Sequence, residues 1–213
     1  MADQRHLVTA LLDQQGRTYA EEAGIRLADK PSPLYQLLVL STLLSARISA
    51  DVAVAAAREL FHAGYRNPRA MLAASWQDRV DALGRGHYRR YDERTATMLG
   101  TAAEHVLDRW HGDLRRMHAE AEGDPKALNT LLTEFAGIGP TGADIFLREV
   151  QTVWTDIAPY ADAKVSDGAR TLGLPTSARA LDRLAPPGRL AALVSGLVRI
   201  SLDAKAADRV RAA

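Results

Sequence analysis

The 213-residue sequence contains no cysteine, which excludes every structure that thiolates hold together. No disulfide can form, and no iron–sulfur cluster can be ligated by cysteine side chains. Lysine is scarce as well, since the chain carries only Lys30, Lys126, Lys164 and Lys205. Few amines are therefore present to act as a covalent nucleophile.

A long apolar run is missing too. The most apolar stretch covers residues 34–46 and is interrupted by Gln36, Ser41, Thr42 and Ser45, whereas a helix needs about 20 apolar residues to cross a bilayer. The first residues, Met-Ala-Asp-Gln-Arg-His, lack the apolar core of a signal peptide. These absences predict a cytoplasmic protein without membrane contact.

The formal net charge of only +1 is weak evidence for a polyanionic partner. The placement of charge is more informative, because one ten-residue window, 85–94, holds Arg85, Arg89, Arg90 and Arg94 with His87, Tyr88 and Tyr91 between them. Arginines interleaved with aromatic rings suit contact with phosphates and stacking on bases. A solvated loop that leads into a helix is an equally good interpretation.

The rest of the composition is that of a folded globular chain, with 47% hydrophobic and 25% charged residues. Apolar positions recur at helical spacing and show no convincing strand alternation, which predicts an all-α fold. Residues 34–45 are apolar on nearly every side, so we expect this helix to be the spine of the core. Thr18 and Glu21 have capping-box spacing, which predicts a short helix before residue 30. Other helices are expected over the ranges 7–16, 49–64, 67–74, 76–83, 92–110, 125–136, 140–150, 163–172, 177–184 and 189–210.

The most informative stretch is residues 127–150. Its first apolar pattern stops at Gly137, which can adopt the left-handed cap conformation, and Pro140 is well suited to begin a second helix. The two helices would be joined by the tight loop Gly137-Ile138-Gly139. Unpaired amides at the start of the second helix could bind an anion such as DNA phosphate. An ordinary helical corner explains the same residues without a ligand.

Three blocks of the sequence resemble the DNA glycosylase superfamily that includes endonuclease III. Leu-x-x-Phe-Ala-Gly-Ile-Gly-Pro-x-Gly-Ala resembles its helix-hairpin-helix, and the segment from Asp162 to Arg-x-Leu-Gly-Leu looks like the one that begins with its catalytic aspartate. Residues 43–51 are similar to its Leu-Leu-Ser-Ala-Gln block. The resemblance implies a two-lobed helix-hairpin-helix DNA glycosylase fold, with residues 31–150 in one lobe and residues 1–30 plus 151–213 in the other.

The resemblance also implies a monomer that acts on double-stranded DNA containing a lesion. Asp162 would be catalytic, stabilising the positive charge that develops on the sugar as the bond to a damaged base stretches. An aspartate just before a helix is also a good N-cap, and the two roles can coexist. The phosphate anchor would comprise the hairpin residues Gly137, Ile138, Gly139, Thr141 and Gly142.

Further DNA contacts follow from the same alignment of blocks. Arg47 stands where relatives place a glutamine that fills the gap left by an extruded nucleotide, although a surface arginine at a helix end is as good an explanation. Arg85 and His87 fall in a segment that aligns loosely with a second DNA-inserting loop. Lys164, two residues beyond Asp162, is expected to contact phosphate or solvent.

Two departures from the family narrow the expected activity. Thr141 occupies the position of the lysine nucleophile of the bifunctional members, which implies a monofunctional glycosylase with weak or absent AP lyase activity. The four-cysteine cluster that many relatives carry near the C-terminus is excluded here. We therefore expect no cofactor, apart from a monovalent cation that hairpin carbonyls could hold.

A metal site is not expected, because the spacing of His87, His105, His111 and His118 does not suit ligation. The excised base is not specified by the sequence. The main alternative function is a helix-hairpin-helix DNA-binding protein that has lost catalysis. A general helical interaction domain is a third possibility and predicts no DNA affinity even at low salt.

Overall fold

The computed structural model describes residues 2–213, which form α-helices and no strand. The prediction of an all-α fold is confirmed. The helices are α1 (Ala2–Gln15), α2 (Tyr19–Glu22), α3 (Pro31–Leu44), α4 (Ala50–His62), α5 (Pro68–Ala73), α6 (Trp76–Arg85), α7 (Asp92–Trp110), α8 (Leu114–Glu120), α9 (Pro125–Thr133), α10 (Pro140–Val150), α11 (Ala163–Thr171), α12 (Ala178–Leu184), α13 (Leu190–Leu202) and α14 (Ala204–Arg211).

Most helices begin where the sequence places a capping side chain. The hydroxyl of Thr18 accepts from the amide of Glu21, and the amide of Thr18 donates to the carboxylate of Glu21, which completes a capping box. Ser49 and Asn67 each accept a bond from the third residue of the helix that follows. These bonds satisfy amides that the first turn of a helix leaves unpaired, which is why local sequence predicts them well.

Two helical regions differ from the prediction. A helix that we did not predict, α8, follows Asp113, whose carboxylate accepts from the amide of Arg115. The single helix predicted over 189–210 is instead divided into α13 and α14 at Asp203, which caps the second helix through the amide of Lys205. In both cases an aspartate N-cap determines the boundary, because its side chain competes with the helical backbone bonds.

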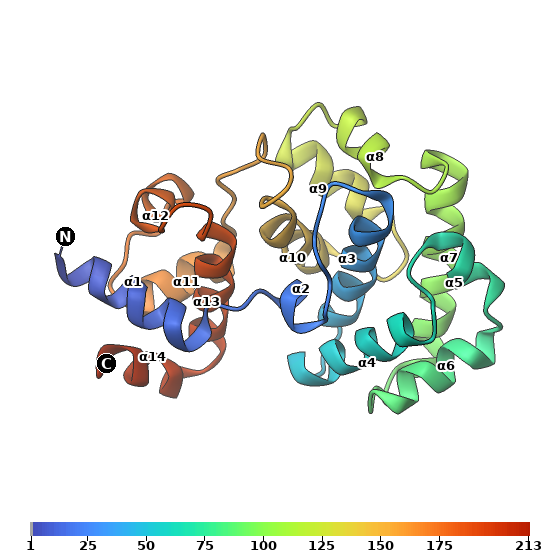
Figure 1. The fold of residues 1–213 in the computed structure, drawn as a ribbon, viewed down its shortest axis with the longest axis horizontal. Helices are drawn as coiled ribbons and strands as arrows, with labels where there is room; N and C mark the ends of the chain where they lie inside the picture. Colours follow the sequence, from blue (N-terminus) through green and yellow to red (C-terminus); the bar gives the residue numbers. More distant parts are fainter. Residues whose placement is uncertain (1) are drawn as a thin grey trace.

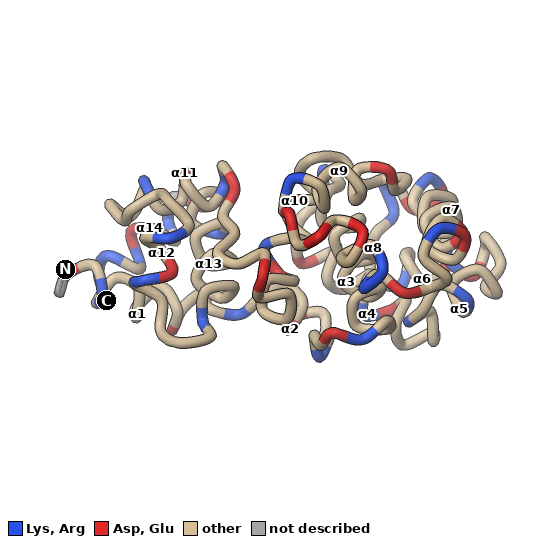
Figure 2. Tube along the Cα trace, turned by 90° about the horizontal axis from the view of Figure 1, so that it is seen from above, with Lys and Arg blue, Asp and Glu red and all other residues tan. Residues whose placement is uncertain are grey.

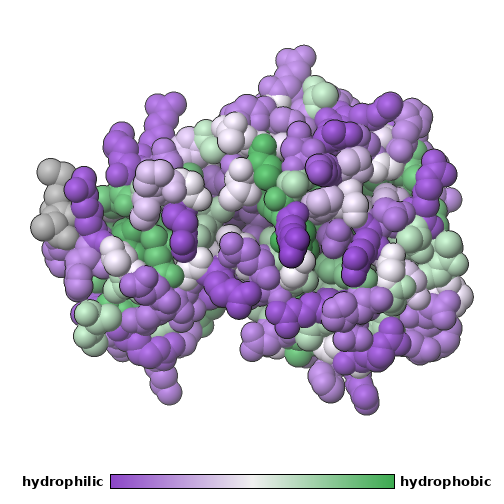
Figure 3. Space-filling model, viewed as in Figure 1, coloured by the Kyte–Doolittle hydropathy of each residue, from purple (hydrophilic) through white to green (hydrophobic). Residues whose placement is uncertain are grey.

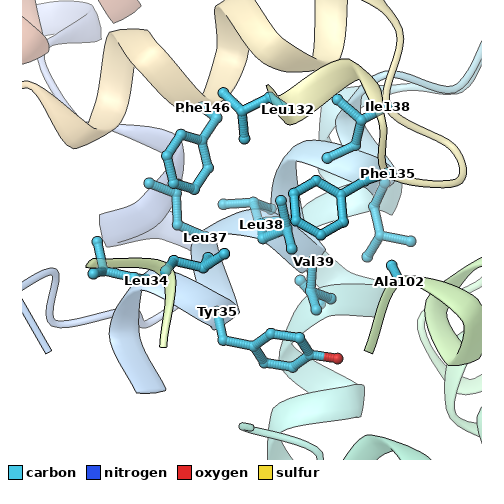
Figure 4. Close-up of a cluster of buried hydrophobic side chains, with 14 of the residues drawn as sticks. Leu34, Tyr35, Leu37, Leu38, Val39, Ala102, Leu132, Phe135, Ile138 and Phe146 are labelled. Carbon is cyan, nitrogen blue, oxygen red and sulfur yellow. The ribbon is translucent and has the colours of Figure 1, made fainter. Parts of the chain in front are cut away.

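Helix α3 is the spine of the larger core, as its apolar sequence predicts. Except for Gln36, its side chains from Leu34 to Leu43 are buried. Figure 4 shows Leu37 and Leu38 of α3 close to Phe135, Ile138 and Phe146, which come from the α9–α10 region. The hairpin is therefore fixed to the central helix by apolar packing.

The buried apolar residues form two clusters. The larger extends from Tyr19 to Ile157, and the smaller joins α1 to the helices from α11 onward. Figure 1 shows the corresponding arrangement, with α1 beside α11–α14 and the helices α3–α10 on the other side of the molecule. Tyr19–Ile25 and Trp154–Ile157 pack in the larger cluster, although the prediction assigned residues 1–30 and 151–213 to the second lobe. The division into two domains stays a prediction.

A buried carboxylate connects the two clusters. Glu149 of α10 is 2% exposed and accepts hydrogen bonds from the amides of Tyr19 and Ala20 at 3.1 and 3.0 Å. It also accepts from the hydroxyl of Ser195 on α13 at 3.1 Å. One side chain thus joins the hairpin's second helix to the N-terminal segment and to the smaller cluster.

The surface carries mixed charge and little apolar area. In Figure 2, basic and acidic residues alternate along the molecule rather than gathering in one stripe. Figure 3 shows hydrophilic side chains over most of one face, with apolar ones in small patches. Within residues 2–213, none of the helices has the length and apolar character needed to cross a membrane.

Candidate DNA-binding and base-excision site

The hairpin has the backbone that its sequence predicts. Gly137 has φ +88°, in the left-handed region that only glycine adopts without strain, and Pro140 is the first residue of α10. The amide of Ile138 donates to the carbonyl of Phe135, which closes the turn. The predicted loop Gly137-Ile138-Gly139 is therefore present.

The start of α10 offers unpaired donors. Among residues 2–213, the amides of Thr141 and Gly142 have no carbonyl partner, and the first backbone bond into this turn comes from Ala143 to Gly139. Thr141 is exposed, and a side chain at Gly139 would meet no atom within 4 Å. Unpaired amides at the positive end of a helix, with open space beside them, suit an anion such as a phosphate.

Helix α3 holds this loop in place at its C-terminal end. The hydroxyl of Ser45 donates to the carbonyl of Gly137 at 3.1 Å. The side chain of Ile138 is buried, so only its backbone could contact DNA. Gly142 lies close to Ser45 and Ile138, because an added Cβ would be 3.3 and 3.1 Å from their side chains, a tight contact.

Two glycines of the loop make a matched test. Gly137→Ala is expected to destabilise the protein by about 2 kcal/mol, because it adds left-handed strain and a Cβ 3.0 Å from Met98 Sδ and Thr42 Cγ2. Gly139→Ala, at φ −95° with open space around it, is expected to change stability by less than about 0.5 kcal/mol. Urea denaturation measures both, and equal effects would contradict this account of the loop.

A pocket of about 400 Å³ opens beside the hairpin. We call it the hairpin pocket, and its walls come from the end of α3, the segment before α7, the first turns of α7 and the hairpin loop. Its lining residues are Thr42, Ser45, Ala46, Arg47, Tyr88, Tyr91, Arg94, Thr95, Met98 and Gly137. Parts of the Leu-Leu-Ser-Ala block, the arginine-rich window and the hairpin thus meet at one cavity.

The predicted DNA contacts occupy different places around this pocket. Arg47 is exposed and lines it. His87 is exposed and held in the left-handed region at φ 63°, outside the lining. Arg85 points toward α4, where its Nε lies 3.2 Å from the carboxylate of Glu59. Arg94, which we noted only as part of the basic window, is the second arginine of the pocket.

Asp162 has the N-cap position that was predicted and a partner that was not. Its Oδ1 accepts from the amide of Val165 at 3.0 Å, which caps α11. Its Oδ2 lies 2.7 Å from Nη1 of Arg148, and both side chains are only 7% exposed. The low exposure agrees with a water-poor site, but a substrate sugar would have to reach a carboxylate that already has two partners. Lys164 is exposed.

A second carboxyl group lies in the same network. Asp144 accepts a 2.6 Å hydrogen bond from the hydroxyl of Tyr160. Burial raises the pKa of Asp144, the Tyr160 bond partly opposes this, and the nearby charge of Asp162 raises the pKa further. Burial and the bond to Asp144 raise the pKa of Tyr160. Arg148, Asp144 and Tyr160 thus define the electrostatic surroundings of Asp162.

Sequence reasoning missed this network. Arg148 lies in an apolar run with Phe146, Leu147 and Val150. A charged residue on a buried helix face requires a partner, since an unpaired buried charge is costly. That signal could have identified Arg148, but the partner 14 residues away depends on how α10 meets the loop before α11.

Two kinds of cation site were considered for this region. Residues 2–213 contain no group of three or more His, Asp or Glu side chains placed to hold a metal ion. The hairpin carbonyls of Phe135, Gly137 and Gly139 each accept one hydrogen bond, which leaves each a second lone pair. A monovalent cation there stays a prediction.

Comparison with known proteins found a similar solved structure, at low sequence identity. No protein-family model matches the chain, and no curated protein matches its sequence. Among solved structures, a trapped covalent intermediate of endonuclease III with DNA, an estranged-adenine complex, is similar with a TM-score of 0.49 and 15% sequence identity. The match covers 91% of this chain and 84% of that one. The chemistry of the site rests on this chain's own residues.

Proposed function

We propose that the protein is a monofunctional DNA glycosylase that acts as a monomer on double-stranded DNA containing a lesion. The observation that carries the proposal is the hairpin pocket, where two exposed arginines and two tyrosines lie beside the glycine loop. The loop amides bind a backbone phosphate, and the arginines add charge along the same face. Arg47 enters the duplex where the target nucleotide leaves it, offsetting part of the lost stacking.

In this proposal Asp162 supplies the chemistry of base removal. The bond between C1′ of the sugar and the base nitrogen breaks, and its electron pair leaves with the base, which takes up a proton. The carboxylate stabilises the positive charge on the sugar until water adds to C1′ and loses a proton. Arg148 fixes the carboxylate against α10, the helix whose first turn binds the phosphate.

A DNA-binding protein without catalysis is the second candidate. One specific observation favours it, namely the 2.7 Å ion pair of Asp162 with Arg148, in which both side chains are 7% exposed. Such a pair neutralises the charge that base removal would use and is a common way to hold two elements together. Thr141, in place of a lysine nucleophile, is compatible with both candidates.

Duplex affinity separates both candidates from a general interaction domain. At low salt we expect measurable binding of a short duplex, which Arg47→Ala and Arg94→Ala each weaken. Each variant is expected to lower the slope of log affinity against log salt by about 0.9. Arg179→Ala, an exposed arginine on α12, is the control for loss of charge alone.

Fluorescence anisotropy with a labelled duplex measures these affinities. If the wild type shows no binding at low salt, the proposed function is wrong and the interaction domain is the better interpretation. If all three arginine variants weaken binding equally, the contact is nonspecific and the hairpin pocket has no special role.

The absent lysine leads to a prediction about strand cleavage. Borohydride is expected to trap no covalent complex with abasic DNA, because residue 141 cannot form a Schiff base. Denaturing gel electrophoresis detects the cross-link. Efficient trapping that disappears in Lys164→Ala would assign a lyase function to Lys164 and contradict the monofunctional proposal.

A further inference from the structure

A second pocket lies at the opposite end of α3. It has a volume of about 630 Å³ and is formed by the segment after α2, the first turn of α3 and the end of α4. Thr42 and Ser45 of α3 line the hairpin pocket, whereas Ser32 and Gln36 line this one. At 1.5 Å per residue the two ends are roughly 18 Å apart along α3.

The charge of this second pocket has one sign. Arg26, Arg58 and Arg66 are exposed and line it, together with His62, and no acidic residue is among the lining residues. We call it the arginine pocket. Three guanidinium groups around one concavity repel one another and concentrate positive potential there, which an anion would relieve.

Backbone contacts hold two of these arginines in place. Arg58 donates to the carbonyl of Glu22, with its Nε at 2.7 Å, and Nε of Arg66 donates to the carbonyl of Phe61 at 2.8 Å. The hydroxyl of Ser32 donates to the carbonyl of Arg66 at 2.9 Å, which fixes that residue against the start of α3. A guanidinium has five N–H donors, so each arginine keeps several for a ligand.

Arg26 differs from the other two, since no hydrogen bond or ion pair involves its side chain anywhere in residues 2–213. The ring of Phe61 and Pro33 supply apolar wall beside the charges. The volume of the pocket falls within the usual ligand range of about 300–1,000 Å³. Its apolar wall and its several guanidinium donors suit a phosphate ester with an organic part.

We propose that the arginine pocket binds the phosphate group of a nucleotide, at a site separate from the phosphate anchor in the hairpin. Planar guanidinium groups bind phosphate oxygens in pairs, which gives both charge and directed donors. The phosphate could belong to a free nucleotide or to a DNA strand that extends around the molecule. Its position at the far end of α3 from the hairpin favours the free nucleotide.

Adenosine diphosphate is a suitable probe for the test, with isothermal titration calorimetry at fixed, low ionic strength. We expect one binding site in the wild type, and an affinity at least about fivefold lower in Arg26→Gln, which removes one charge-assisted contact. Arg26→Lys should keep most of the affinity. Arg179→Gln is the matched control, because it removes the same charge from an exposed position outside the pocket.

Repeating the titration in the presence of a saturating amount of duplex DNA distinguishes the two sources of the phosphate. Unchanged binding of the diphosphate assigns the pocket to a free nucleotide. Mutual exclusion, with Arg26→Gln weakening duplex binding more than Arg179→Gln does, assigns it to a DNA phosphate. If the wild type binds neither ADP nor inorganic phosphate at millimolar concentration, or if Arg26→Gln and Arg179→Gln have equal effects, the proposal is overturned. The result does not depend on whether the protein excises bases.

Discussion

Replacing Asp162 with asparagine is expected to lower the rate of base excision roughly 100- to 1,000-fold, the usual loss when an enzyme's main charge-stabilising group is removed. Asparagine is nearly the same shape and is also a good N-cap, so α11 should still begin at residue 163. Duplex affinity should not fall, because the proposed phosphate anchor lies in the hairpin. Single-turnover assays on a lesion duplex measure the rate, and anisotropy measures the affinity.

The matched control for that variant is Asp144→Asn. Asp144 belongs to the same network and accepts a hydrogen bond from Tyr160, but it forms no ion pair with Arg148, whereas Asp162 does. We expect a smaller loss of rate from this variant. The thermal stability of both variants should be measured alongside their rates. Asp162→Asn leaves Arg148 without its anionic partner, and such a loss costs stability. Equal excision by wild type and Asp162→Asn would exclude the proposed role of Asp162.

The largest loss of stability is expected from Glu149→Ala, at about 3 kcal/mol or more. The change leaves the amides of Tyr19 and Ala20 and the hydroxyl of Ser195 without their common acceptor, and each unsatisfied buried group costs about 1–3 kcal/mol. Relief of the desolvation of the carboxylate offsets part of this sum. Urea denaturation measures the difference.

Glu104→Ala is the control, because Glu104 is exposed on α7 and its loss should change stability by less than about 0.5 kcal/mol. A loss at Glu149 no larger than at Glu104 would show that the connection between the two clusters does not depend on this carboxylate.

Glu149 also makes stability depend on pH. Burial raises its pKa above the ordinary value of 4.5, despite the hydrogen bonds that oppose the shift. Between 4.5 and the folded pKa the folded protein therefore binds more protons than the unfolded chain, so this residue's contribution falls as pH rises. Glu149→Gln removes the titration. The free energy of unfolding of Glu149→Gln, relative to that of the wild type, should therefore increase as pH rises above 4.5. A difference between the two proteins that does not change with pH would contradict this.

Local signals in the sequence were sufficient for most of the fold. Ser49, Asn67 and Asp162 each predicted a helix start that the structure has, because an N-cap bond joins residues only a few positions apart. Gly137 predicted the hairpin for the same reason. The break at Asp203 was missed, since the apolar pattern continues across it while one aspartate side chain interrupts the helix.

The contacts that define the candidate site were harder to predict. Arg148 and Asp162 are 14 residues apart, and Glu149 meets partners 130 and 46 residues away. Such pairs depend on how whole helices pack, which periodicity and capping do not specify. The sequence therefore led to the proposal that Asp162 is catalytic and did not indicate that its carboxylate is already paired with Arg148.

Base release from duplexes with a single lesion tests the central claim most directly. A panel with an alkylated purine, an oxidised base, a deaminated base and a mismatched adenine is incubated with wild-type protein and then treated with alkali. The account predicts alkali-labile sites on at least one duplex, without strand cleavage before alkali. Binding of every duplex with no alkali-labile site on any of them would contradict base excision and leave a DNA-binding protein without catalysis.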